Sequence, residues 1–318
     1  MIIHPGDSEW ETYATAFAPD GNRLITGGSS LTLWDLETGQ RLQVFEDDSI
    51  SGPILFSPDG KIAAVAYINA GGWVFRVKLW DLTAGKSIHK LEYSIARIDR
   101  YYPNTWWVAM AFSPDGKRLL TGDVTSKLAL WDTSTGDMVW QYWVYGRARG
   151  ILAGKLSFVL DGKGAIVHCG GVHVYLVDLE KAEVVYDMFA CCFSVSSDGA
   201  QLLINGDGSI RLHNSATGDL IRSFPSEIVE YKQRMVLSPY GNLAIVNPPY
   251  RQEHIYPRRI VDMNTGEVLR TYSPDSDTLY EFSPDGKRFL TANGTSREIH
   301  IWDISDLQSA VQEASLYD

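Results

Sequence analysis

Residues 281–287 read Glu-Phe-Ser-Pro-Asp-Gly-Lys, and residues 300–304, a short distance further on, read His-Ile-Trp-Asp-Ile. An alternating apolar run enters the Pro-Asp-Gly segment, and a second apolar run leaves it. Proline, aspartate and glycine in succession are typical of a tight turn, because they supply a fixed φ, a side-chain acceptor and a positive φ. The stretch predicts two antiparallel strands joined by a hairpin, followed by a third strand that ends in Trp-Asp.

The same unit recurs along the whole chain. A turn glycine follows an apolar run seven times, at Gly21, Gly60, Gly116, Gly162, Gly199, Gly241 and Gly286. The matching third strands close at Asp35, Asp81, Asp132, Asp178, Asn214, Asp262 and Asp303. A period of about 40 to 45 residues with four strands per repeat is typical of a β-propeller. The chain is therefore predicted to be all-β, with seven four-stranded antiparallel blades.

Four repeats carry a literal Trp-Asp pair, at Trp34-Asp35, Trp80-Asp81, Trp131-Asp132 and Trp302-Asp303. On these pairs the chain resembles the WD-repeat (Trp-Asp repeat) propeller family over nearly its whole length. The Gly-His pair of that family is absent from every repeat, and its aspartate at the hairpin between the second and third strands stands in register only as Asp207. We therefore expect apolar packing in place of the buried His, Ser/Thr, Asp and Trp network that the resemblance implies.

The two ends of the chain predict how the last blade is completed. Residues 1–4 stand where every other repeat has the fourth strand of the preceding blade. We expect them to complete blade seven and so remove an exposed sheet edge. The propeller is then a single domain over residues 1–304. Residues 305–318 have apolar side chains at helical spacing and predict a short C-terminal helix.

Composition and charge narrow the class of protein. The chain has 318 residues and a net charge of −11, which opposes non-specific binding to nucleic acid or to an anionic membrane. Three cysteines, two of them adjacent, do not suggest a disulfide framework. The start of the chain lacks the features of a signal peptide, and no apolar run is long enough to span a membrane. We expect a soluble cytoplasmic protein.

Long loops on one side of the predicted propeller carry arginine and aromatic residues. Such side chains dominate interface hot spots, and long loops on a rigid scaffold commonly carry function. The predicted partner-binding residues are Arg97, Arg100, Tyr101, Tyr102, Trp106, Tyr145, Arg147, Arg149, Tyr250, Arg251, His254 and Tyr256. The alternative is that the aromatics cover their own loops while the arginines pair with local acids such as Asp99 and Glu253. The aspartates of the opposite turns are interpreted as turn-stabilising residues.

Catalytic and cofactor motifs are not recognisable in the sequence. The chain has no nucleophile elbow, no zinc-protease motif and no calcium loop. His168 and His173 would face each other if Gly170 and Gly171 formed a two-residue turn, but a metal site normally needs three or four ligands. We expect no catalytic residue, no metal and no cofactor.

The resemblance implies a non-catalytic scaffold that binds a protein or peptide through the loop-rich face. The chain would act as a monomeric ring or as a subunit of a larger complex, without a membrane. An alternative is an enzyme of the quinoprotein or lactonase type, since other propeller families carry such activities. Nucleic-acid binding through the arginine-rich rim is a further alternative, which the net charge disfavours.

Overall fold

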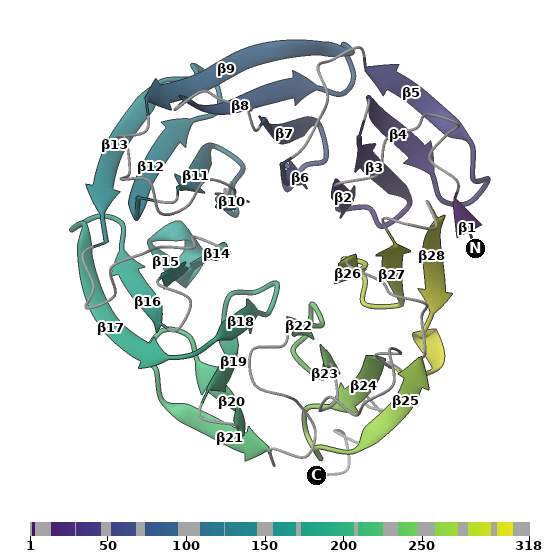
Figure 1. Cartoon of the computed structure of the whole chain (residues 1–318), viewed down its shortest axis with the longest axis vertical. Helices are drawn as coiled ribbons and strands as arrows, with labels where there is room; N and C mark the ends of the chain where they lie inside the picture. The colour runs from purple at the N-terminus through teal and green to yellow at the C-terminus, as the bar shows by residue number, and fades with distance from the viewer. Residues whose placement is uncertain are drawn as a thin grey trace, which may run out of the picture. The chain divides into compact units, whose positions relative to one another are not determined.

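The computed structural model describes most of the chain. The described residues are 2–3, 14–28, 30–45, 52–67, 74–94, 109–123, 125–144, 155–169, 173–206, 209–224, 235–246, 258–272, 279–293 and 298–307. They form seven four-stranded antiparallel sheets, the blades of a seven-bladed β-propeller, which confirms the predicted fold class (Figure 1). Helical structure among the described residues is limited to the 3₁₀ turn η1 (Leu160–Gly162) and a single turn at residues 305–307.

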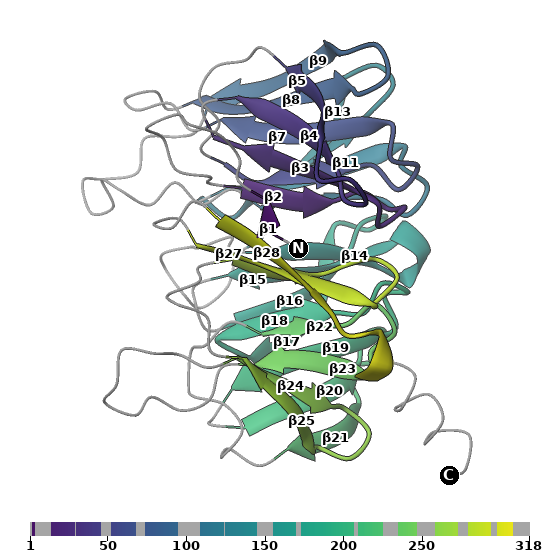
Figure 2. The ribbon, with the colours of Figure 1, turned by 90° about the vertical axis from the view of Figure 1, so that its right-hand side faces the viewer.

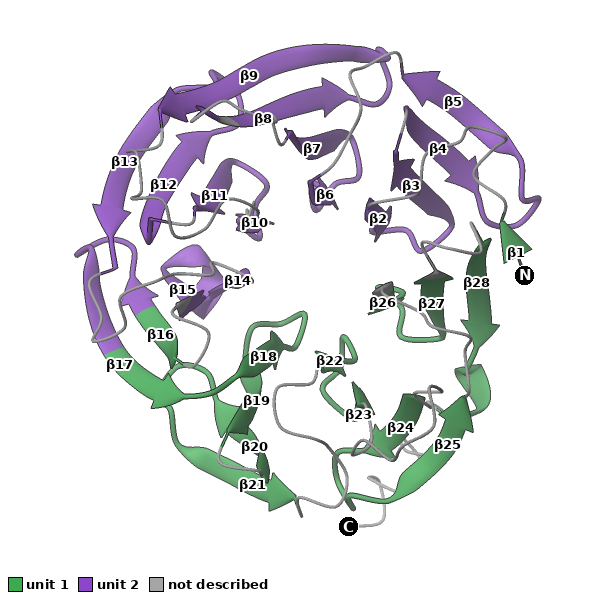
Figure 3. Ribbon diagram, viewed as in Figure 1, with its two compact units in different colours: residues 1–4, 172–176, 186–318 green, residues 5–171, 177–185 purple. Residues whose placement is uncertain are grey.

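The chain divides into two compact units (Figure 3), of which unit 2 comprises residues 5–171 and 177–185. Its first three sheets are blade 1, blade 2 and blade 3, with strands in sequence order. Blade 1 contains β2 (Ala14–Phe17), β3 (Arg23–Gly27), β4 (Leu31–Asp35) and β5 (Arg41–Phe45). Blade 2 contains β6 (Ile54–Phe56), β7 (Ile62–Tyr67), β8 (Val74–Asp81) and β9 (Lys86–Ser94). Blade 3 contains β10 (Ala109–Phe112), β11 (Arg118–Gly122), β12 (Lys127–Asp132) and β13 (Met138–Trp143).

Blade 4 is the sheet whose strands belong partly to each unit. It contains β14 (Leu156–Val159), β15 (Gly164–Cys169), β16 (His173–Asp178) and β17 (Glu183–Phe189).

Unit 1 comprises residues 1–4, 172–176 and 186–318. Blade 5 contains β18 (Cys192–Val195), β19 (Gln201–Gly206), β20 (Ser209–Asn214) and β21 (Leu220–Phe224). Blade 6 contains β22 (Val236–Leu237), β23 (Leu243–Val246), β24 (Arg258–Asp262) and β25 (Val268–Tyr272).

Blade 7 contains β26 (Leu279–Phe282), β27 (Arg288–Asn293) and β28 (Glu298–Asp303), and its fourth strand is β1 (Ile2–Ile3). In β1, Ile2 pairs with His300 and Ile3 pairs with Ile299, so the predicted pairing of the N-terminal strand with the last blade is confirmed. Both views of the ribbon show β1 beside β28 (Figures 1 and 2). The predicted C-terminal helix begins at residues 305–307, and its remainder lies outside the described residues.

A buried serine stabilises the Ser-Pro-Asp-Gly turn through two hydrogen bonds of its hydroxyl group. The Oγ of Ser283 donates to the Asp285 carboxylate at 2.5 Å and accepts the backbone N–H of Arg288 at 2.9 Å. Ser283 is fully buried, and Gly286 has a φ of 64°, a value that glycine adopts without strain. The hydroxyl thus bridges the two strands across the turn. Equivalent serines are Ser57, Ser113, Ser196 and Ser238.

Blade 4 departs from this turn. Leu160 stands where five of the other blades have proline and blade 5 has Ser197, and both Leu160 and Asp161 adopt positive φ, at 54° and 50°. Blade 5 keeps the regular turn without proline, because Ser196 still bonds to Asp198 and to the backbone N–H of Gln201. Blade 4 has Val159 in place of that serine, so it lacks both the hydroxyl bridge and the proline that fixes φ near −65°, and it forms the different turn η1. The expected Pro-Asp-Gly geometry is therefore not repeated in this blade.

Tryptophans of three Trp-Asp pairs form hydrogen bonds with buried threonines. Each indole N–H donates to a threonine hydroxyl on the neighbouring second strand, two positions beyond the residue that pairs with the tryptophan. The bonds run from Trp34 to Thr26, from Trp131 to Thr121 and from Trp302 to Thr291, each at 3.0 Å. The expectation of apolar packing is thus corrected, because these blades combine apolar packing with one polar part of the family's network.

Trp80 of blade 2 has no such partner. Val65 occupies the position of the threonine, and the buried Trp80 Nε1 has no hydrogen-bond acceptor among the described residues. We expect Val65→Thr to raise the free energy of unfolding by about 1 kcal/mol, because a hydroxyl of nearly the same size would satisfy the indole N–H. The matched reverse change, Thr121→Val, should lower it by about 1–2 kcal/mol. Urea denaturation of both variants measures this, and a destabilised Val65→Thr variant would contradict the assignment.

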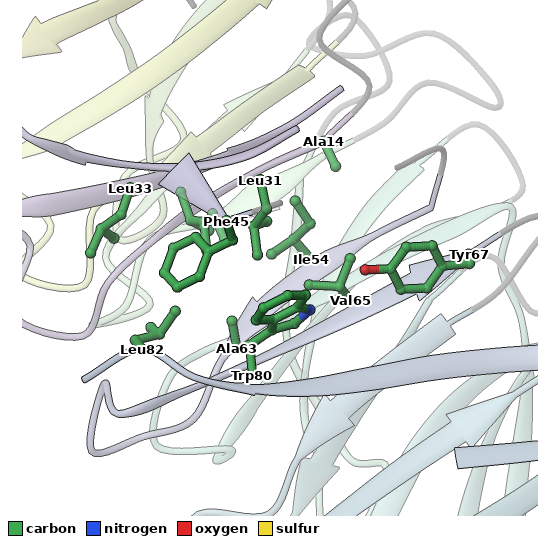
Figure 4. Close-up of a cluster of buried hydrophobic side chains, with 12 residues drawn as sticks. Ala14, Leu31, Leu33, Phe45, Ile54, Ala63, Val65, Tyr67, Trp80 and Leu82 are labelled. Carbon is green, nitrogen blue, oxygen red and sulfur yellow. The ribbon is translucent and has the colours of Figure 1, made fainter. Parts of the chain in front are cut away.

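Apolar side chains fill the space between successive sheets. In unit 2, Phe45 of blade 1 meets Trp80 of blade 2 edge to face, with ring centroids 5.5 Å apart. Leu31, Leu82 and Ile54 pack around this pair (Figure 4). Phe45 is 1% exposed, so the contact lies deep in the cluster. Burial of this apolar area stabilises the packing of blade 1 against blade 2.

Polar contacts near the start of the outermost strands also join neighbouring blades. In both units a side chain on the fourth strand of one blade donates to a backbone carbonyl of the next blade. The pairs are His89 with Ser134 at 2.9 Å, Trp140 with Leu179 at 3.2 Å, Tyr186 with Ser215 at 2.7 Å, and Arg222 with Asn264. Since a carbonyl only accepts, the Nε2 of His89 carries the proton in its pair. These bonds fix the offset between adjacent sheets.

Candidate functional site

The twelve predicted partner-binding residues all fall at positions 95–108, 145–154 and 247–257, outside the described residues. Their role stays a prediction. The strands that lead into two of these segments are described, because β9 ends at Ser94 and β13 ends at Trp143. The candidate site is therefore built from the side chains at these strand ends.

Four side chains of blades 2 and 3, all within unit 2, contact one another near the ends of β9 and β13. We call them the hairpin cluster: Tyr93, Asp123, Lys127 and Trp143. Tyr93 lies on β9 and Trp143 on β13, while Asp123 and Lys127 flank the hairpin between β11 and β12. None of the four residues belongs to a recognisable sequence motif. Their contacts join residues about 30 positions apart, which no local pattern reveals.

Asp123 organises the hairpin. It is 1% exposed, and its Oδ1 accepts the backbone N–H of Thr125 at 2.7 Å, the Thr125 hydroxyl at 2.6 Å and the backbone N–H of Lys127 at 3.2 Å. Its Oδ2 accepts the Tyr93 hydroxyl at 2.9 Å. Ser126 within the same hairpin has a φ of 63°, a conformation that these bonds hold in place. Blade 3 therefore carries a hairpin aspartate, although the sequence pattern identified only Asp207, which lies outside the described residues.

Tyr93 is a fixed hydrogen-bond donor. Burial raises the pKa of its hydroxyl far above the ordinary value, and the neighbouring Asp123 charge raises the pKa further. The ring stacks on Trp131, with centroids 6.1 Å apart and planes 16° from parallel. Tyr93 therefore stays protonated and ties the outer strand of blade 2 to the hairpin of blade 3.

Lys127 places its ammonium against two aromatic rings. The nitrogen lies 3.8 Å from the centroid of the Tyr93 ring and 5.6 Å from that of Trp143. The residue is 9% exposed, and burial lowers the pKa of the ammonium while the Asp123 charge opposes that change. Cation–π contacts favour the charged form and hold the group in position. The cluster thus presents a positioned cation in a strongly acidic protein.

The aspartates of the opposite turns are occupied by local bonds. Asp132 accepts the Ser134 hydroxyl at 2.6 Å, and Asp35 accepts the backbone N–H of Thr38 at 2.7 Å. Hydrogen bonds from such donors lower the pKa of both carboxyl groups. These contacts support the interpretation that aspartate stands in the turns to stabilise them.

Acid should weaken these turns. For Asp59 and Asp115 the serine hydroxyl is the largest cause of a pKa below the usual 3.8. A carboxyl group whose folded pKa is depressed contributes stability above its unfolded pKa and loses that contribution as pH falls through the folded value. We therefore expect the free energy of unfolding to decline below about pH 4. Ser113→Ala should move the pKa of Asp115 back toward 3.8 in a carboxyl NMR titration while Asp132 is unchanged, and an unmoved Asp115 would refute this cause.

The described residues form neither a metal-ligand cluster nor a membrane-spanning helix. Within the described ranges, no group of three or more His, Cys, Asp or Glu residues could hold a metal ion. The Nδ1 of His173 lies 3.4 Å from the Asp187 carboxylate, a geometry suited to an ion pair when the histidine is protonated. Within the same ranges, no helix is both long and apolar enough to cross a bilayer.

Comparison with known proteins gives partial matches. A family model described as "WD domain, G-beta repeat" matches residues 99–132, which include the Trp131-Asp132 pair and both hairpin residues of the cluster. Small ribosomal subunit protein RACK1 of Drosophila melanogaster is 29% identical over 119 residues, 37% of this chain and 36% of that protein. Protein tipD of Dictyostelium discoideum is 25% identical over 256 residues, 74% of this chain and 37% of that protein.

The guanine nucleotide-binding protein subunit beta of Zea mays is 27% identical over 213 residues. That match covers 58% of this chain and 51% of the plant protein. The chain therefore spans between about a third and a half of the length of these three relatives.

Proposed function

We infer, from the seven-bladed fold and the similarity of this chain to WD-repeat proteins, that it is a non-catalytic scaffold that binds a protein or peptide partner through its loop-rich face. The names of two relatives, a small ribosomal subunit protein and a subunit of a guanine nucleotide-binding protein, describe parts of larger assemblies. A rigid propeller suits this role, because its sheets hold loops from distant parts of the chain in a fixed arrangement.

The observation that carries the proposal is the position of the hairpin cluster. A rigid group of two aromatic rings, a buried carboxylate and a cation stands at the ends of β9 and β13. Those strands lead into the segments that contain Arg97, Arg100, Arg147 and Arg149. Aromatic and arginine side chains dominate binding energy at protein interfaces, especially where the supporting structure is preorganised.

A pull-down experiment tests the proposal. Tagged wild-type protein is incubated with extract of the source cells, and the captured proteins are identified by mass spectrometry. Simultaneous replacement of Arg97, Arg100, Tyr101, Tyr250 and Arg251 by alanine is expected to abolish capture of the specific partner while the thermal melt stays unchanged. Hot-spot truncations cost about 2 kcal/mol or more each, so five together leave no measurable binding.

The matched control replaces lysines at the turns on the opposite side of the blades. Lys61 and Lys181 have exposed side chains, and their replacement by alanine should leave capture unchanged. Equal capture by the five-residue variant and the wild type would refute binding through this face.

A further inference from the structure

We propose that the ammonium of Lys127 anchors a carboxylate of the bound partner, so that the partner of the hairpin cluster is an acidic peptide segment. This inference rests on the proposed scaffold function and deepens it, because it gives the chemistry of the partner.

The position of Lys127 is unusual for a lysine. It is the first residue of β12, and its side chain is drawn inward between the outermost strands of blades 2 and 3. Lysine is rarely more than nine-tenths buried unless it is paired, and Lys127 is 9% exposed. The aromatic rings of Tyr93 and Trp143 compensate part of the lost hydration, since the faces of both rings are negative.

The ammonium of Lys127 has N–H donors without a strong hydrogen-bond acceptor among the described residues. An ammonium has three N–H donors, and an aromatic face is a weak acceptor for them. In the part of the chain that the structure describes, no oxygen accepts a hydrogen bond from Lys127 Nζ and no carboxylate forms an ion pair with it. Asp123, the nearest acid of the cluster, is already engaged by four donors. A carboxylate from a partner would supply the missing acceptor.

The charge of the neighbouring sequence favours an acidic partner. Residues 95–108 contain two arginines and one aspartate, and residues 145–154 contain two arginines and no acid. These segments carry a net positive charge in a chain whose total is −11. Electrostatic complementarity selects partners of the opposite sign and disfavours those of the same sign. The described site contributes the charge of Lys127, and the sequence composition of residues 95–108 and 145–154 has the same sign; both favour a peptide that is rich in aspartate and glutamate.

Peptide selection tests the inference. A display library of random twelve-residue peptides is selected on the full-length chain, and the enriched peptides are expected to contain more Asp and Glu than the input library. Lys127→Met keeps a side chain of similar length but removes the charge, and should weaken binding of these peptides about tenfold or more. Lys127→Arg should retain part of the binding.

Lys78→Met is the matched control. The ammonium of Lys78 lies 4.7 Å from the centroid of the Tyr67 ring in blade 2, so the change also removes a cation–π contact. It should leave peptide binding unchanged. A loss of affinity common to both methionine variants would indicate a general structural effect and would overturn the assignment.

A double-mutant cycle distinguishes a direct contact between Lys127 and a peptide glutamate from a general structural effect of the Lys127 variant. Each conserved Glu of an enriched peptide is changed to Gln, and one such change should weaken binding to the wild type about tenfold while leaving binding to Lys127→Met unaltered. Equal losses on both proteins would overturn the Lys127 contact but not the scaffold function. Enrichment of peptides without acids would overturn the contact as well. If no peptide is enriched and no protein is captured from extract, both proposals fail.

Discussion

Replacing Phe289 with alanine is expected to lower the free energy of unfolding by about 3–5 kcal/mol, the largest single effect expected in unit 1. Phe289 is fully buried on β27. Its ring stacks on Trp302, with centroids 6.0 Å apart, and meets Tyr272 edge to face at 4.9 Å. Tyr272 and Trp302 also contact each other at 5.0 Å, so the three rings form one packed group. Removing the central ring leaves a cavity that two large neighbours cannot fill.

Urea denaturation followed by tryptophan fluorescence measures this effect, because Trp302 lies against the altered site. Val268→Ala on β25 is the control, since Val268 is 37% exposed and its truncation should change stability by only about 0.5 kcal/mol. Equal destabilisation by the two variants would show that the aromatic group is not a centre of packing.

Replacing Ile3 with alanine is expected to lower the free energy of unfolding by about 2–4 kcal/mol. Ile3 is 2% exposed and pairs with Ile299, which is 1% exposed. Loss of the side chain therefore removes buried apolar area from the final sheet. Deleting residues 1–4 should lower the melting temperature further, because β28 then becomes an unpaired edge with free N–H and C=O groups.

Ile2 provides a control on the same strand. It faces the other side of β1 and is 50% exposed, so Ile2→Ala should have an effect of about 0.5 kcal/mol or less. Differential scanning calorimetry of the two alanine variants and the deletion separates side-chain burial from strand pairing. An unchanged melt after the deletion would refute the contribution of β1 to the blade.

Local chemistry made much of the fold predictable from the sequence. The turn serines, aspartates and glycines act within five residues of one another, as the bonds of Ser283 with Asp285 and Arg288 illustrate. The N-terminal strand was predictable because one repeat lacked a fourth strand. The turn at Leu160 was not predictable, since the loss of both the serine and the proline removes two constraints without indicating which conformation replaces the regular turn.

Contacts across blades account for most of what the sequence did not reveal. Tyr93 and Asp123 belong to different repeats, and their hydrogen bond depends on the offset of two sheets. The same holds for Lys127, which in sequence is an ordinary lysine at the start of a strand. The Trp–Thr bonds have no signature in the sequence, because threonine on a second strand is also an ordinary β-forming residue. The prediction of the rim residues rests on residue type and loop length, and the pull-down experiment tests their role.

The pairing of β1 with β28 also has a consequence for biosynthesis. Ile3 and Ile299 are separated by almost the entire chain, so the first strand is made long before its partner. At a translation rate of about 5–20 residues per second, Ile3 waits roughly 15–60 seconds in a nascent chain without its native neighbour. The last blade is completed only when the ribosome has delivered residues 298–303. A factor that binds β1 during this interval would delay completion of blade 7 without contacting the folded protein.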